Sequence, residues 1–198
     1  MKDFWNGRYG ELEYIYGEEP NIFFAEQLHK IKPGKIILPC EGEGRNGVYA
    51  ASQGWNVNAF DLSEAGKAKA LQLANKKGVE LNYIIEDANT VNYTENSVDA
   101  VAFIYAHFPP DTRKLIHQKA ISWLKPGGRI IVEAFNPQQL QNNSGGPKDL
   151  SMLYTENIIK EDFGRLKIEC VQMVRAELKE GKYHEGMSDI IRFVGIKI

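Results

Sequence analysis

The sequence predicts an α/β fold of three layers, with helices on both faces of a seven-stranded, mostly parallel, Rossmann-like sheet. Three observations carry this prediction. Between residues 34 and 135, short apolar segments alternate with amphipathic ones, as strands and helices do in a parallel sheet. A glycine-rich turn, residues 42–47, follows the first apolar segment and leads into a helix-compatible stretch. Two long segments, 166–178 and 188–198, read as an antiparallel hairpin.

Helix and strand signals place the remaining elements in order. Pro33-Gly34 ends a first amphipathic helix, Gly54 and Gly78 are typical of helix ends, and Ser63 is a good N-cap. Segment 97–105 is nearly all apolar, as expected of a strand covered on both faces. The predicted elements are helix 20–31, strand 35–38, a helix to about 53, strand 55–60, helix 64–77, strand 81–85, strand 97–105, helix 109–124 and strand 129–135.

The chain reads as a single domain, 1–198, in three parts. These are an N-terminal cap and helix over 1–33, a βαβ core over 34–135, and a long loop, a helix at about 155–163 and the hairpin within 136–198. The loop, 136–150, is rich in Asn, Gln, Gly and Pro and follows a strand's carboxyl end. Because a loop this long is more often functional than idle, we expect it to line a binding site.

The glycine-rich turn indicates a nucleoside-binding half-sheet. Gly42 to Gly47 satisfies GxGxxG, and Asp61 follows about twenty residues on, where a carboxylate on ribose hydroxyls is expected. Glu41 and Glu43 lie inside the turn. A dinucleotide places its pyrophosphate there, and two carboxylates oppose that anion. S-adenosylmethionine carries no phosphate and bears a sulfonium and an ammonium, so the electrostatics favour it over NAD.

The ordered series of short motifs resembles the class I S-adenosylmethionine-dependent methyltransferases, in particular the small bacterial branch of tellurite-resistance and thiopurine-type enzymes. The motifs are GEGRN at 42–46, GW at 54–55, DLS at 61–63, the acidic pair at 86–87, LKPGG at 124–128 and EGxxHxG at 180–186, with an N-terminal cap within 4–21. GxGxxG alone is weak, whereas the series spans nearly the whole chain. The resemblance implies a class I methyltransferase fold with a C-terminal antiparallel hairpin.

Two positions depart from the family pattern. The family usually has an acidic residue just before the glycine turn and a glycine at its first position. Here these positions hold Leu38 and Cys40. The missing carboxylate normally helps to position the cofactor's amino-acid end, and Glu41 or Glu43 is the candidate to compensate.

Open α/β sheets bind ligands beyond the carboxyl ends of their strands, which gathers the candidate cofactor residues in one place. Gly42 and Gly44 let the backbone approach the ligand, or are plain turn glycines. Asp61 accepts from the ribose hydroxyls, or caps the next helix. Asp87 accepts from the adenine amino group, with backbone from Ala88, or forms a solvated turn. The full predicted set also contains Glu41, Arg45, Asn46, Leu62, Tyr105, Tyr9 and Tyr16.

Three members of this set have further alternatives. Arg45 pairs with the cofactor's carboxylate, or with Glu41 or Glu43. Tyr9 and Tyr16 belong to the segment that, by the resemblance, folds over the cofactor. An aromatic face beside a sulfonium gives a cation–π contact of about 0.5–2 kcal/mol. Loose surface packing of either tyrosine is the alternative.

Two histidines are candidates for a catalytic base, which methyl transfer needs only when the acceptor must lose a proton. His107 follows the fourth predicted strand, and an unperturbed pKa near 6.5 suits a base; capping a helix or filling a polar niche is its alternative. His184, in the hairpin loop, matches a family histidine. His29 and His117 lie on predicted helices and are expected at the surface.

Composition limits the partners. The chain has 198 residues, a formal net charge of −2 and no lysine or arginine cluster, which gives no reason to propose nucleic acid or an anionic membrane. No apolar stretch approaches the roughly 18–20 residues of a membrane span, and no signal peptide is recognisable. A cytoplasmic monomer or homodimer without a metal site is expected.

The sequence therefore predicts an S-adenosylmethionine-dependent methyltransferase that acts on a small-molecule acceptor, such as a thiol or a metalloid. One alternative is a non-catalytic protein that binds S-adenosylmethionine. A more distant alternative is an NAD(P)-dependent oxidoreductase.

Overall fold

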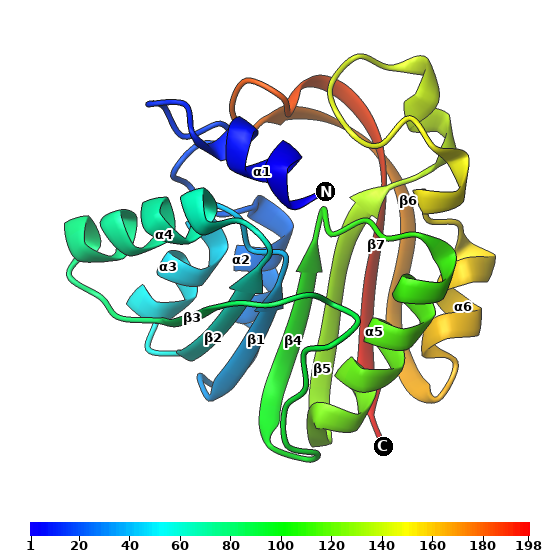
Figure 1. The fold of residues 1–198 in the computed structure, drawn as a ribbon. Helices are drawn as coiled ribbons and strands as arrows, with labels where there is room; N and C mark the ends of the chain where they lie inside the picture. Colours follow the sequence, from blue (N-terminus) through cyan, green and yellow to red (C-terminus); the bar gives the residue numbers. More distant parts are fainter.

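A computed structural model describes residues 1–198 and contains one seven-stranded sheet with the strand order β3-β2-β1-β4-β5-β7-β6 (Figure 1). All strands except β7 run in the same direction, and β7 is antiparallel to both of its neighbours, β5 and β6. The predicted mostly parallel sheet with an antiparallel hairpin is confirmed. The strands are β1 (Lys35–Pro39), β2 (Asn56–Asp61), β3 (Asn82–Ile85), β4 (Val98–Ile104), β5 (Leu124–Phe135), β6 (Leu166–Lys179) and β7 (Glu185–Lys197).

Helices cover both faces of this sheet and form the two outer layers. One apolar core joins the sheet to α5 and α6, and the other joins it to α2, α3 and α4. None of the helices is long and apolar enough to cross a membrane. The helices are α1 (Lys2–Tyr9), α2 (Ile22–Leu28), α3 (Arg45–Ser52), α4 (Glu64–Lys77), α5 (Pro110–Trp123) and α6 (Glu156–Phe163), with short 3₁₀ helices η1 (Pro137–Gln141) and η2 (Leu150–Met152).

Local sequence signals explain several element ends. The Ser63 hydroxyl accepts from the backbone N–H of Gly66 and so caps α4, as expected. Gly78 ends the same helix in the left-handed conformation, with φ of 67°. β5 begins at Leu124, earlier than the predicted 129, because Leu124 pairs with Val98 before the ladder shifts its register.

Two expectations about helices differ from the structure. Residues 2–9 were expected only as part of a cap, and they form α1. His117 was expected at the surface, and this prediction is wrong: its side chain is fully buried. Its Nδ1 lies 2.8 Å from Asp162, and its Nε2 lies 3.3 Å from the Tyr154 hydroxyl. A histidine on an amphipathic helix can thus face the core when a buried carboxylate satisfies it.

Strand order reverses around β1, which lies between β2 and β4. The glycine-rich turn follows β1 at this switch point, where open α/β sheets bind their ligands. Helix α1 and the β6–β7 turn extend over the same carboxyl end of the sheet (Figure 1). The fold therefore brings the N-terminal segment and the β6–β7 turn to one place.

Candidate active site

The turn after β1 contains three residues with left-handed backbone. They are Cys40, Gly42 and Gly44, with φ of 54°, 58° and 88°. A Cβ atom on Gly44 would lie 2.5 Å from the Ala70 Cβ, so this glycine lets α4 pack against the turn. A Cβ atom on Gly42 would lie 2.6 Å from the Tyr9 hydroxyl. Cys40 is the one residue of the turn that bears the steric cost of a side chain at positive φ.

Glu41 lies beneath the start of α3. Its Oε1 accepts from the backbone N–H of Gly47 at 2.6 Å, so the carboxyl group faces the positive end of the helix dipole. Burial raises the pKa of Glu41 to about 7, and the hydrogen bond from Gly47 and the nearby Arg45 partly oppose this rise. Glu41 is thus a buried carboxyl group whose pKa lies near neutral pH, so small changes in its surroundings decide whether it is ionised.

Glu43 has a different role, although it lies only two residues away. Its Oε2 accepts from the backbone N–H groups of Ile15 at 2.9 Å and Tyr16 at 3.3 Å. Its Oε1 accepts from the Lys69 ammonium at 2.8 Å. Glu43 therefore fastens the N-terminal segment to the glycine turn and to α4, so of the two turn carboxylates Glu41 is the better candidate to replace the acid missing at Leu38.

Asp61 ends β2 and faces the turn. One carboxylate oxygen accepts from Gly42 N–H at 3.1 Å and the other from Ser63 N–H at 2.9 Å. Burial raises its pKa. Because Ser63 itself supplies the cap of α4, the simple N-cap alternative for Asp61 is not what the structure shows. Each oxygen keeps acceptor capacity for a further donor, as ribose hydroxyls require.

Asp87 follows β3 at the same end of the sheet. Its Oδ1 accepts from the backbone and side-chain N–H groups of Asn89, at 2.8 and 2.7 Å. The contacts close a local turn and leave the other oxygen without a protein partner. The side chain of Ala88 packs into the core, and Leu62 is half-buried. Contact of these residues with an adenine ring remains a prediction.

The N-terminal segment covers the turn with aromatic rings. Tyr9 is 5% exposed and stacks on Trp5 with ring centroids 5.3 Å apart. The Tyr16 hydroxyl accepts from Arg8 at 3.0 Å. Both tyrosines lie beside the turn, as their predicted role requires, and loose surface packing does not describe Tyr9.

A buried polar network joins the N-terminal segment to three other elements, and it combines the predicted residues Arg45, Asn46 and Tyr105 with others that the sequence analysis did not single out. The Asn21 amide donates to Glu133 at 2.6 Å and to Glu180 at 2.9 Å, and Asn21 N–H donates to the Asn46 side chain at 2.9 Å. Arg45 donates to Glu180 at 2.9 Å, a partner that the sequence gave no reason to choose. The remaining contacts to Glu133 come from the Tyr105 hydroxyl at 2.9 Å and Arg192 at 2.6 Å.

His107 uses both ring nitrogens within the protein. Nδ1 lies 2.8 Å from the Met152 carbonyl, and Nε2 accepts from the Phe135 N–H at 3.2 Å. Burial lowers the pKa of His107 to about 4. A ring whose lone pair already accepts a backbone hydrogen bond has no free site for a substrate proton. The geometry favours the polar-niche alternative for His107 over the catalytic one.

His184 is enclosed by aromatic rings but keeps one nitrogen available. Its ring centroid lies 4.5 Å from that of Tyr16, 4.4 Å from Tyr105 and 5.3 Å from Phe135. Nδ1 is buried without a hydrogen bond and lies 3.5 Å from the Glu180 carboxylate. Nε2 has no protein partner either, but it is not sealed from solvent. The structure thus favours His184 over His107 as a base.

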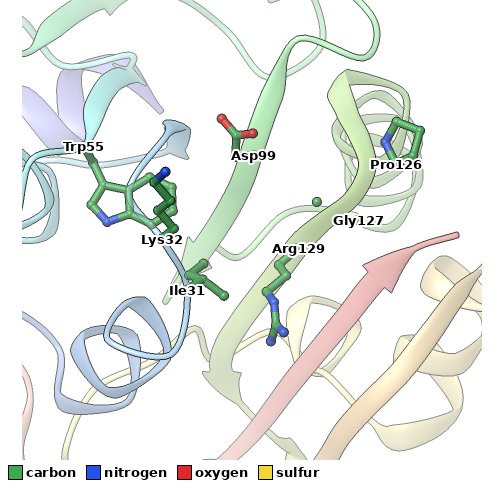
Figure 2. A pocket seen from close by; sticks show the side chains of 8 residues that line it. Ile31, Lys32, Trp55, Asp99, Pro126, Gly127 and Arg129 are labelled. Carbon is green, nitrogen blue, oxygen red and sulfur yellow. The ribbon is translucent and has the colours of Figure 1, made fainter.

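One hollow of the molecule lies elsewhere. It measures about 250 Å³ and is lined by residues around the starts of β1, β4 and β5, including Trp55, Asp99 and Arg129 (Figure 2). This is the amino end of the sheet, opposite to the glycine turn. It is therefore not where the strand-end residues would hold a nucleoside.

The residues at the carboxyl end suit S-adenosylmethionine in charge and in hydrogen-bonding capacity. Asp61 and Asp87 retain acceptor oxygens that could bind hydroxyl and amino groups, and Glu41 would supply a carboxyl group to a cationic ligand. The buried carboxyl group of Glu41 already occupies the start of helix α3, which disfavours a pyrophosphate there. When bound, S-adenosylmethionine supplies an electrophilic methyl group on a sulfonium.

Sequence comparisons agree with this reading. The family model described as "Methyltransferase domain" matches residues 39–128. The probable S-adenosyl-L-methionine-dependent methyltransferase TehB of Haemophilus influenzae is 24% identical over 143 residues, which are 66% of this chain and 47% of TehB. A tRNA (uracil(54)-C(5))-methyltransferase of Pyrococcus abyssi is 26% identical over 151 residues, 69% of this chain and 35% of that protein. The chain thus spans about half or less of the length of these relatives.

Solved structures share the fold over the whole chain. The crystal structure of TehB from Haemophilus influenzae superposes with a TM-score of 0.73 at 18% identity, and covers 100% of this chain and 67% of TehB. Magnesium protoporphyrin IX methyltransferase from Synechocystis, solved with bound SAH, gives a TM-score of 0.74 at 16% identity, with 100% and 97% covered. These findings support S-adenosylmethionine as the cofactor. The recognition made from the sequence is therefore confirmed: residues 39–128 match a methyltransferase-domain model, and the chain resembles the class I S-adenosylmethionine-dependent methyltransferases, TehB among them.

Proposed function

We propose that this chain transfers the methyl group of S-adenosylmethionine to a small-molecule acceptor. The observation that carries the proposal is the meeting of the glycine turn, Asp61 and the enclosed His184 at the carboxyl end of one sheet. The turn and Asp61 hold the cofactor, and His184 Nε2 faces the acceptor. In-line methyl transfer needs little more than alignment and exclusion of water, which the aromatic cap provides.

The enclosure around His184 supports a small acceptor. The rings of Tyr16, Tyr105 and Phe135 surround His184, and the formal net charge of −2 gives no reason to expect a polynucleotide. A thiol or a metalloid oxyanion suits such an enclosure. The tRNA methyltransferase among the relatives makes RNA the acceptor to test alongside them.

Calorimetry with S-adenosylmethionine, S-adenosylhomocysteine and NADH tests the cofactor, with binding of the first two and none of the third expected. Formation of S-adenosylhomocysteine is then followed against thiols, metalloid oxyanions and tRNA. Turnover with a thiol or oxyanion supports the proposal, and turnover with tRNA alone overturns the small-molecule acceptor. Tight binding without turnover on any acceptor favours the non-catalytic alternative.

A further inference from the structure

The β6–β7 turn holds Glu180 and His184 in a fixed relation. Glu180 N–H donates to the His184 carbonyl at 2.9 Å, and His184 N–H donates to the Gly181 carbonyl at 3.0 Å. Gly181 has φ of 87°, and a Cβ atom there would clash with the Ile15 carbonyl of the N-terminal segment. The turn is therefore closed by its own backbone and pressed against the cap, so the two side chains have little freedom to separate.

Glu180 is ionised in this setting. Its side chain is 11% exposed and accepts from Arg45 and from Asn21, each at 2.9 Å. Burial acts to raise the pKa of Glu180, but the contacts with His184 and Arg45 outweigh it and hold the pKa at about 2. An ionised carboxylate can only accept hydrogen bonds. A nitrogen that hydrogen-bonds to it must therefore carry a proton, and one that faces it at a longer distance is favoured to carry one.

The nitrogen that faces it is His184 Nδ1, 3.5 Å from Glu180 Oε2 and buried without another partner. A neutral imidazole carries one proton, and the nitrogen without it has a lone pair. We propose that Glu180 is a positioning residue: its carboxylate keeps the proton of neutral His184 on Nδ1, so that Nε2 presents its lone pair to the methyl acceptor. This inference rests on the proposed function.

The proton balance of the step follows from this arrangement. The acceptor atom forms a bond to the methyl carbon as the bond between that carbon and sulfur breaks, which turns the sulfonium into a neutral thioether. The acceptor's proton passes to His184 Nε2, and the resulting imidazolium is stabilised by the Glu180 carboxylate. No oxidant, reductant or further reactant is required.

His184 must be neutral before the step, and its burial and the two nearby arginines act in that direction, whereas Glu180 opposes them. Burial lowers the pKa of His184 most, Glu180 raises it, and Arg45 and Arg8 lower it. His107, also neutral, and the hydroxyls of Tyr16 and Tyr105 are the other titratable groups packed near the ring. Arg45 is the first residue of α3 and follows the glycine turn directly. Because the Glu180 carboxylate contacts Arg45 and also faces His184, it links the cofactor side of the site to the base.

Nitrogen-15 NMR of histidine-labelled protein tests the tautomer without any acceptor or cofactor. Comparison with a His184→Gln variant identifies the His184 signals. A protonated Nδ1 and an unprotonated Nε2 are expected near pH 7.5. The opposite tautomer overturns the proposal. Because the measurement keeps the wild-type Glu180, it does not depend on a Glu180 variant being able to fold.

Glu180→Gln provides the second test, with Glu185→Gln, an exposed residue of the same hairpin, as the matched control. The carboxamide has the same shape but no charge and can donate as well as accept. We expect a mixture of His184 tautomers and a kcat lower by roughly tenfold or more, with the affinity for S-adenosylmethionine changed much less. An unchanged tautomer and an unchanged kcat reject the role.

The two proposals fail in distinguishable ways. If the wild-type protein binds no S-adenosylmethionine, the proposed function fails whatever the tautomer is. If it binds the cofactor and methylates an acceptor while His184 carries its proton on Nε2, only the positioning role of Glu180 fails.

Discussion

Glu43 of the glycine turn and Lys69 of α4 form an ion pair of 2.8 Å whose two side chains are 2% and 11% exposed. The same carboxylate accepts from the Ile15 and Tyr16 backbone. Glu43 lies inside the turn, where a ligand contact would be expected. Its carboxylate instead holds the N-terminal segment in place.

Removing the charge of Glu43 is expected to destabilise the protein. Glu43→Gln leaves the buried Lys69 ammonium without its counter-charge, which costs about 3 kcal/mol, while the double variant with Lys69→Met recovers part of the loss. Urea denaturation measures both, with Lys77→Met on the exposed face of α4 as the control. Hydrogen exchange of the Ile15 and Tyr16 amides should accelerate in Glu43→Gln. Additive effects of the two substitutions would contradict a buried pair.

His107 makes stability depend on pH. Its pKa falls from 6.5 to about 4 on folding because it is buried. Below pH 6.5 the unfolded chain takes up a proton that the folded protein does not, so stability rises with pH between about 4 and 6.5. The loss between pH 7 and pH 4 from this residue is about 3 kcal/mol. His107→Gln, which keeps a donor and an acceptor, should flatten this part of the curve. A wild-type slope in the variant would assign the effect to other groups, such as His117.

Asp61→Ala is expected to weaken S-adenosylmethionine binding by roughly ten- to a hundredfold, since a hydrogen bond to a charged group contributes about 1.5–3 kcal/mol. Calorimetry measures the dissociation constant. Because Asp61 also accepts from Gly42 and Ser63, thermal unfolding of the variant must be followed in parallel. Asp149→Ala, at an exposed residue on the far side of the 136–150 loop, is the control. An unchanged dissociation constant in a folded Asp61 variant rejects the ribose contact.

Substitutions of Cys40 test how much the left-handed backbone of the turn reduces the stability of the protein. At φ of 54°, a glycine relieves about 1–2 kcal/mol of steric strain but gains unfolded-state entropy and loses a partly buried thiol. Cys40→Gly should therefore stay within about 1 kcal/mol of the wild type, whereas a β-branched Cys40→Val should be less stable by about 2 kcal/mol or more. Thermal unfolding measures both. Equal stability of the two variants would show that the turn relaxes away from this conformation.

The mostly parallel sheet with its C-terminal hairpin and the place of the turn could be predicted from the sequence because their elements carry local signals. Gly42, Gly44 and Ser63 have conformational or capping requirements that a short window reveals, and each adopts the expected geometry. Strand β4 (Val98–Ile104) matches the predicted segment 97–105, and β7 (Glu185–Lys197) begins three residues before the predicted 188–198.

Contacts between distant segments could not be predicted in this way. Nothing near Arg45 in the chain points to Glu180, which is 135 residues away. Asn21 looks like an ordinary helix cap, and it is one, but its amide also joins two buried carboxylates. His107 and His184 follow similar sequence cues, and only their hydrogen bonds separate the occupied ring from the available one.

The position of β7 has a consequence for the order in which the site is assembled. β7 follows every other strand in the chain, yet it lies between β5 and β6. During synthesis, β6 therefore has no partner in the sheet until β7 has left the ribosome. The turn with Glu180 and His184 forms only then, so Asn21, made 159 residues before Glu180, has to wait for this partner. A nascent chain that stops before β7 has a glycine turn and Asp61, but no completed pocket in which to use a methyl donor.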